Sequence, residues 1–246
     1  MDRARLMRWT ETTPEEAAED VAGKVCAWAE ARAEGAERGA LLLPTGSSPK
    51  PLYAELRKRA AAGALDASAW KSFNLDEYWP CPAESPISFR TFMEEELIAP
   101  LGLGQEQIGF LDGACAVDQV VAQCAAYEQT MADAGGIDLA ILGVGVNGHL
   151  AFNEPGTLWG CRTRMVTLED TTRARPGFPG GVKEGPEKAL SVGIGTILEA
   201  REIVVLAFGE AKQEALQVLR QGSADLAWPV TSLLAHGAVT VYCDPA

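Results

Sequence analysis

The sequence predicts one three-layer α/β domain, with a mostly parallel sheet covered by helices on both faces. Strand-sized apolar runs alternate along the chain with longer stretches of helical spacing, which is typical of this class. The run at 40–43 is apolar throughout, as expected for a parallel strand that is buried on both faces. A length of 246 residues fits a single domain spanning 1–246, and no internal repeat divides it.

The elements follow from local signals in order. Thr13-Pro14-Glu15-Glu16 is a capping box with proline in the first turn, which predicts a helix from there to about residue 38. Ser88 is expected to cap another helix, and Gly222 lies just past the end of a third. The remaining predicted elements are a strand at 40–43, helix 49–62, strand 71–75, helix 88–98, helix 117–134, strands 138–144 and 202–208, helix 211–220 and strand 239–243.

Composition narrows the class of protein. There are 34 acidic and 21 basic residues, a formal charge of −13, so binding to nucleic acid is not expected. No apolar run approaches the ~20 residues of a membrane span, and the N-terminus has no secretory apolar segment, which predicts a cytoplasmic protein. The six cysteines show no Cys-x-x-Cys spacing, and no ligand cluster has metal spacing, so we expect reduced thiols and no metal.

Ligands of such sheets bind at the carboxyl ends of the strands, where four loops are expected. The first loop, 44–48, combines small hydroxyl residues and a glycine before a helix, which suits a phosphate, although Ser48 could instead cap the helix. The second carries Asp76 and Glu77. A partly desolvated carboxylate there could take a proton from carbon, but such acids are more often caps or solvated turn residues.

The third loop, 143–156, is the densest in polar residues and glycines. Its G-x-G-x-x-G spacing does not indicate a dinucleotide site, because Pro155-Gly156 stops any long helix. His149 lies five residues before Glu154, with Asn147 near, and a histidine oriented by a carboxylate is a general acid and base. The fourth loop places Lys212 at a helix start, where a bound anion would offset the unfavourable dipole, although this loop alone fits a surface lysine that points to solvent better.

Together these loops resemble the glucosamine-6-phosphate deaminase (isomerase) family, which belongs to a superfamily that includes the 6-phosphogluconolactonases. The resemblance covers nearly the whole chain from about Leu41, and its most specific block is Asn-Gly-His-x-x-Phe-Asn-Glu-Pro. The other matching blocks are Leu-Pro-Thr-Gly-Ser-Ser-Pro, Phe-Asn-Leu-Asp-Glu-Tyr, Cys-Arg-Thr-Arg, Ala-Leu-Ser-Val-Gly-Ile-Gly-Thr-Ile-Leu and Phe-Gly-Glu-Ala-Lys.

The resemblance implies an enzyme that opens the ring of an amino-sugar phosphate, isomerises aldose to ketose and releases ammonia. It implies no metal and no organic cofactor. The implied catalytic residues are Asp76, which takes the C2 proton, and His149, which moves protons for ring opening with Asn147 and Glu154 beside it. The residues implied to hold the phosphate are Thr45, Gly46, Ser47 and Lys212, with Arg173 or Arg175 as a candidate arginine in a lid at about 168–187.

Other features of the family are matched less well. Asn147 is an amide where some relatives have aspartate, so Glu154 is expected to orient His149 alone. Arg164 matches an allosteric-site residue, but Val166 and Leu158 replace polar neighbours, so allosteric activation is not expected. Two other functions stay open, a 6-phosphogluconolactonase-type hydrolase and a non-catalytic sugar-phosphate binding protein. The sequence also leaves open which amino-sugar phosphate is the substrate and whether the protein forms a homo-oligomer. His236, the second histidine, is expected to be structural.

Overall fold

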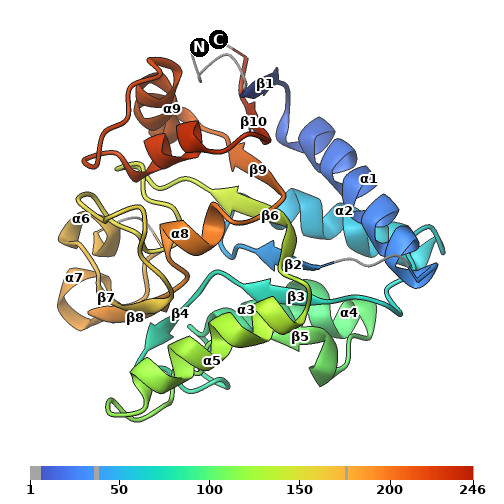
Figure 1. The fold of residues 1–246 in the computed structure, drawn as a ribbon, viewed down its shortest axis with the longest axis horizontal. Coiled ribbons are helices and arrows are strands. Elements are labelled where there is room, and N and C mark those ends of the chain that lie inside the picture. Colours follow the sequence, from blue (N-terminus) through green and yellow to red (C-terminus); the bar gives the residue numbers. More distant parts are fainter. Residues whose placement is uncertain (1–6, 36–38, 175–176, 246) are drawn as a thin grey trace.

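The computed structural model describes residues 7–35, 39–174 and 177–245. Its centre is a sheet of seven parallel strands between two layers of helices, so the predicted three-layer architecture is confirmed (Figure 1). In spatial order the strands are β1 (Arg8–Glu11), β10 (Val239–Cys243), β9 (Glu202–Ala207), β6 (Ile137–Gly143), β2 (Ala40–Leu43), β3 (Ser72–Asn74) and β5 (Ile108–Gly109).

Helices cover both faces of this sheet. Leu41 and Leu43 face one layer, which contains α1 and α2, while Leu42 faces the other, which contains α5 and α9. This alternation explains the apolar runs, since every second side chain of a strand points to the opposite face. The helices are α1 (Pro14–Ala33), α2 (Lys50–Ala61), α3 (Phe89–Met93), α4 (Ala99–Leu101), α5 (Val120–Asp133), α6 (Asp170–Arg173), α7 (Gly181–Glu184), α8 (Ile194–Ile197) and α9 (Gln213–Arg220).

A second sheet was not predicted. It contains three short antiparallel strands, β4 (Asp76–Trp79), β8 (Lys188–Ser191) and β7 (Arg164–Thr167). Leu75 joins it to the large sheet, because its N–H donates to the carbonyl of Leu43 (3.1 Å) and its carbonyl accepts from the N–H of Val192 (2.8 Å). Asp76 therefore lies where the two sheets meet.

Several predicted boundaries need correction. The first helix ends at Ala33, and part of its predicted end, 36–38, lies outside the described residues. The predicted helix 88–98 is α3 followed by one π-helical turn, η2 (Glu94–Ile98), which continues into α4. The predicted helix 211–220 begins only at Gln213, after a 3₁₀ turn, η4 (Glu210–Lys212). A further 3₁₀ helix, η5 (Pro229–Ala235), precedes β10.

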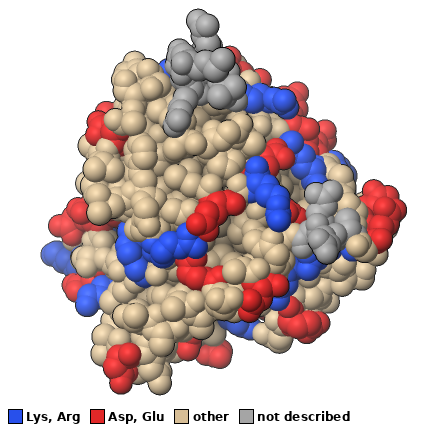
Figure 2. Space-filling view, viewed as in Figure 1, with Lys and Arg blue, Asp and Glu red and all other residues tan. Residues whose placement is uncertain are grey.

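On the face that Figure 2 shows, acidic and basic side chains are interspersed and no extended basic surface forms. Within the described part of the chain, no helix combines the length and apolar character that crossing a membrane requires.

Candidate active site

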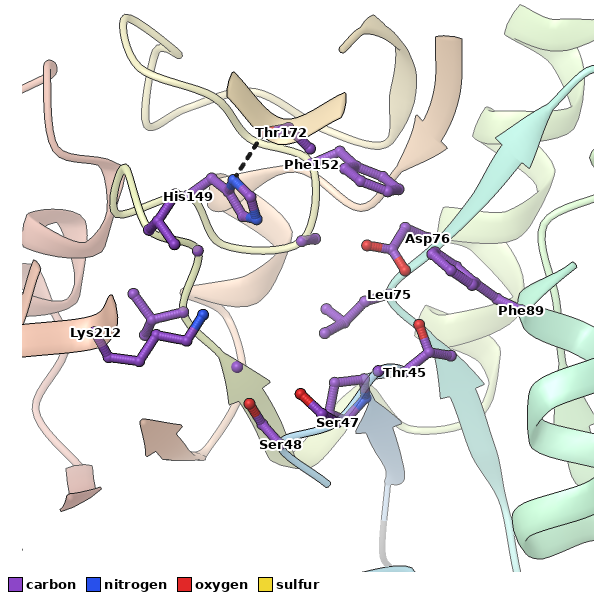
Figure 3. A pocket seen from close by; sticks show the side chains of 17 residues that line it. Thr45, Ser47, Ser48, Leu75, Asp76, Phe89, His149, Phe152, Thr172 and Lys212 are labelled. Atoms are coloured by element: carbon purple, nitrogen blue, oxygen red, sulfur yellow. Dashed lines mark hydrogen bonds between the residues drawn. The ribbon is translucent and has the colours of Figure 1, made fainter. Parts of the chain in front are cut away.

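The four predicted loops meet at one pocket, at the carboxyl ends of the neighbouring strands β9, β6, β2 and β3 (Figure 3). In this view Lys212 and the hydroxyls of Ser47 and Ser48 lie toward one end, and His149 and Asp76 toward the other. The lining residues are Pro44, Thr45, Gly46, Ser47, Ser48, Leu75, Asp76, Phe89, Gly143, Val144, Gly145, Val146, His149, Ala151, Phe152, Thr172 and Lys212.

The loop at 44–48 forms the floor of the pocket. Gly46 has φ +93°, a left-handed conformation that side chains other than glycine rarely adopt. The buried hydroxyl of Tyr53 donates to the carbonyl of Pro44 (2.6 Å), which fixes the loop against α2. Ser48 lines the pocket, and α2 begins beyond Pro49 without a side-chain cap, so the capping role considered for Ser48 is wrong.

The two acids of the second loop face different surroundings. Asp76 lines the pocket, and Figure 3 shows its carboxylate directed into it. Glu77 instead accepts from the backbone N–H groups of Phe89 (3.0 Å) and Arg90 (3.1 Å) at the start of α3, and from the hydroxyl of Ser88 (2.7 Å). Burial raises the pKa of the Glu77 carboxyl, and these hydrogen bonds only partly oppose that shift. Only Asp76 is therefore placed to meet a ligand.

His149 is held by a buried carboxylate. Its Nδ1 lies 3.3 Å from Oε2 of Glu154, and both side chains are about nine-tenths buried. Asn147 donates to the same oxygen (2.8 Å), so the amide positions Glu154 rather than the imidazole. Burial alone would raise the pKa of Glu154, but hydrogen bonds and charge from His149, with hydrogen bonds from Thr172 and Asn147, hold it below its ordinary value. Glu154 is thus an anion suited to orient a proton-carrying imidazole.

The backbone of the third loop is shaped around this ring. A Cβ atom on Gly145 would lie 2.3 Å from Cε1 of His149, so only glycine leaves room for the imidazole there. Asn153, which is fully buried, donates to the carbonyls of Leu150 and Val192, both at 2.8 Å. These bonds fasten the loop to the end of β8.

Thr172 was missed by sequence reasoning. It lies on α6, is 1% exposed and lines the pocket. Its hydroxyl donates to Oε1 of Glu154 (2.6 Å) and lies 3.4 Å from Nδ1 of His149. Glu154 therefore does not orient His149 alone, contrary to the prediction. Thr172 lies in a segment that matches the family poorly, so the resemblance did not point to this residue.

Neither candidate lid arginine is among the described residues that line the pocket. Arg175 lies outside the described residues. Arg173 is buried and donates to the carbonyls of Val182 (2.5 Å) and Gly185 (3.3 Å), which ties α6 to α7. Among the described residues that line the pocket, Lys212 is the only lysine or arginine.

The remaining candidates have structural contacts. His236 donates from Nε2 to the carbonyl of Ala200 (2.7 Å), and its Nδ1 accepts from the N–H of Ala238 (3.2 Å). Arg164 donates to Asn153 (2.9 Å) and contacts the sulfur of Cys161 (3.1 Å). All six cysteines are free thiols. Across 7–35, 39–174 and 177–245, no group of three or more histidine, cysteine or acidic side chains could hold a metal ion.

A parallel sheet covered by helices, with one pocket at its strand ends, defines an α/β protein that binds a small molecule, and comparison with known proteins identifies its family. Residues 12–242 match the family model described as glucosamine-6-phosphate isomerases/6-phosphogluconolactonase. A glucosamine-6-phosphate deaminase of Streptomyces avermitilis is 40% identical over 91% of this chain and 86% of its own length. Another, from Mycolicibacterium smegmatis, is 41% identical over 83% and 78%.

Solved structures show the same relationship. A monomeric glucosamine-6-phosphate deaminase superposes with a TM-score of 0.88 at 31% identity, covering 97% of this chain and 96% of that one. The 6-phosphogluconolactonase of Thermotoga maritima, at 18% identity and a TM-score of 0.72 over 97% and 99%, shares the fold. The chain belongs to the glucosamine-6-phosphate isomerase/6-phosphogluconolactonase family, so the family expected from the sequence is confirmed.

Proposed function

We propose that this protein is an amino-sugar phosphate deaminase that converts glucosamine-6-phosphate, water being consumed, to fructose-6-phosphate and ammonia. The observation that carries the proposal is the arrangement of one pocket. A carboxylate, Asp76, and an imidazole held by a carboxylate, His149, lie at one end, and a lysine and hydroxyl groups lie at the other.

The phosphate is assigned to the end formed by Lys212 and the loop at 44–48. The Nζ of Lys212 supplies a charge-assisted hydrogen bond, and Thr45, Ser47 and the backbone around Gly46 supply neutral donors. Binding energy from this remote group holds the reacting carbons of the sugar beside Asp76 and His149.

His149 is assigned to ring opening. In the neutral ring, Nε2 takes the proton of the anomeric hydroxyl, and the resulting imidazolium delivers a proton to the ring oxygen as the C1–O5 bond breaks. Glu154 offsets the positive charge that develops on the imidazole, and Asn147 keeps that carboxylate in place. The product is the open-chain aldehyde.

Asp76 is assigned to isomerisation. Its carboxylate removes the C2 proton while the ammonium group on C2 passes a proton to O1, which forms an enediol-type intermediate that carries the amine. The Asp76 carboxyl then gives its proton to C1. The resulting iminium carbon at C2 adds water and expels ammonia, which leaves the ketose phosphate. The carbons C1 and C2 are adjacent, so a single carboxylate beside them is enough for both proton transfers.

Two comparisons favour this function over lactone hydrolysis. The curated relatives at about 40% identity are named glucosamine-6-phosphate deaminase, whereas the lactonase structures are 18–21% identical and inform on the fold alone. Tyr78 also follows Asp76-Glu77 where lactonases of the superfamily usually have arginine.

The test is ammonia release from glucosamine-6-phosphate and galactosamine-6-phosphate, with hydrolysis of 6-phosphogluconolactone measured in parallel. We expect turnover of an amino-sugar phosphate, with glucosamine-6-phosphate preferred. Lactone hydrolysis without ammonia release would assign the protein to the hydrolases. Tight binding of both sugars without any turnover would indicate a binding protein.

A further inference from the structure

The hydroxyl of Thr172 lies between Glu154 and the imidazole of His149. The hydroxyl of Thr172 has one proton, which it donates to Oε1 of Glu154 at 2.6 Å. Toward Nδ1 of His149, at 3.4 Å, it can therefore act only as an acceptor. The ionised carboxylate of Glu154 also only accepts, and its Oε2 lies 3.3 Å from the same Nδ1. Both neighbours of Nδ1 are acceptors, so the proton of the neutral ring belongs on Nδ1.

The consequence lies at the other ring nitrogen. With Nδ1 protonated, Nε2 of the neutral imidazole carries a lone pair, and Figure 3 shows this nitrogen on the side of the ring that faces the pocket. A ring in the opposite tautomer would present an N–H there and could not accept a proton from substrate.

Thr172 reaches this place on a separate element from the histidine loop. Residues 170–173 form α6, whose Arg173 is anchored to the carbonyls of Val182 and Gly185. The hydroxyl is therefore presented by a fixed turn, and it contacts Glu154 and His149 together although both lie in the loop after β6.

We propose that Thr172 is a positioning residue that, with Glu154, holds His149 in the tautomer whose Nε2 accepts the substrate proton. The kinetic part of this proposal rests on the proposed deaminase function, whereas the tautomer itself does not. Besides His149, the titratable groups of the described pocket lining are Asp76 on β4 and Lys212 on η4, and Glu154 contacts the imidazole from outside that lining.

The direct test is ¹⁵N NMR of the two imidazoles in the ligand-free protein. The contacts of His236 assign it the opposite tautomer, with the proton on Nε2, so it serves as an internal reference. Signals are assigned with His236→Gln. In the wild type we expect His149 to carry its proton on Nδ1, with Nε2 unprotonated. Thr172→Val should give a mixture of tautomers, and Thr172→Ser should restore the wild-type pattern. Thr171→Val, an exposed neighbour on α6, is the matched control.

The second test is kcat/KM for glucosamine-6-phosphate against pH. Thr172→Val leaves Glu154 with one fewer hydrogen-bond donor, so the carboxylate protonates more readily. The low-pH limb of the kcat/KM profile should therefore move to higher pH. We expect kcat/KM to fall about 10- to 100-fold near neutral pH, the loss typical of a hydrogen bond to a charged group. Thr172→Ser should restore both the rate and the position of the limb.

A Thr172→Val protein with the wild-type tautomer would overturn the proposal. An equal loss at every pH that Thr172→Ser fails to rescue would overturn it too, since that pattern belongs to packing alone. A wild-type enzyme that releases no ammonia would refute the proposed function instead, and the NMR result would still decide the role of Thr172.

Discussion

Successive residues of a strand face opposite ways, and this alternation separates Asp76 from Glu77. Asp76 is directed into the pocket, whereas Glu77 accepts hydrogen bonds from the N–H groups at the start of α3. Two adjacent carboxylates thus have unrelated tasks, one toward a ligand and one toward the backbone.

Asp76→Asn keeps the shape of the side chain and removes its basicity. We expect kcat to fall at least ~10²-fold, as for a lost general base, while substrate binding is retained. Binding is measured by calorimetry and proton abstraction by solvent deuterium exchange at C2. Exchange that persists in the variant would assign the base to another residue.

The two histidines should respond differently to the same substitution. His149→Gln removes the proton carrier, so turnover of the cyclic sugar should be lost. His236→Gln should leave kcat within about twofold of the wild type, because its ring nitrogens hydrogen-bond to the backbone of Ala200 and Ala238 and it is not among the described residues that line the pocket. Steady-state kinetics of both variants, with thermal melting of each, measure this. A dead His236→Gln beside an active His149→Gln would place the catalytic site elsewhere.

At the scale of loops and helices, the site depends on backbone shape as much as on side chains. Gly145→Ala would place a methyl group against the imidazole of His149, since the Cβ position lies 2.3 Å from Cε1. A displacement of about 1 Å can cost ~10²-fold in rate, so we expect a loss of that size in kcat. Gly160→Ala is the control, because nothing lies within 4 Å of its Cβ position. Equal kinetics in the two variants would show that the ring tolerates displacement.

Lys212 belongs to η4, the turn that precedes α9. Lys212→Ala removes the charge at the phosphate end of the pocket, so KM should rise about 10- to 100-fold while kcat changes little. The comparison substrate is unphosphorylated glucosamine, whose turnover should be equally poor in variant and wild type. An unchanged KM for the phosphorylated sugar would mean that Lys212 does not hold the phosphate.

Sequence reasoning found the elements whose signal is local. The capping box at Thr13 predicted α1, and the apolar runs predicted β2, β6, β9 and β10. Because ligands of parallel sheets bind at the carboxyl ends of the strands, Asp76, His149 and Lys212 were expected in one pocket, and all three line it. The strands β1, β4, β5, β7 and β8 were not predicted, because none of them is a continuous apolar run like β2. Thr172 was missed because it lies in a segment that matches the family poorly and its role depends on contacts with Glu154 and His149 from another element.

At the scale of the whole molecule, one partly buried carboxylate, that of Glu128, links three regions of the chain by hydrogen bonds. Glu128 on α5 accepts from the backbone N–H of Thr163 (2.8 Å), from Thr196 on α8 (2.6 Å) and from Arg162 (2.7 Å). Burial alone would raise the pKa of Glu128, but hydrogen bonds from both threonines and the charge of Arg162 hold it below its ordinary value.

A carboxyl whose pKa is lowered by folding stabilises the protein above its unfolded pKa, and this contribution is lost as pH falls through the folded value. Glu128→Gln should therefore cost about 2 kcal/mol of unfolding free energy at pH 7, and the difference from the wild type should shrink below about pH 4.5. Denaturant unfolding at several pH values measures this. Glu199→Gln, an exposed partner of the same Arg162, should change stability by less than ~0.5 kcal/mol. A pH-independent cost at Glu128 would exclude its ionisation as the cause.

The strand order also dictates when the sheet is completed during synthesis. β1 lies at the edge of the sheet and pairs only with β10, although these are the first and last strands along the described chain. On the ribosome the central strands β2, β3 and β6 can pair early, whereas β1 waits until residues 239–243 have emerged. In pulse-labelled hydrogen exchange, the amides of β1 should therefore gain protection together with those of β10. The strands that lie between these two along the sequence should gain protection earlier.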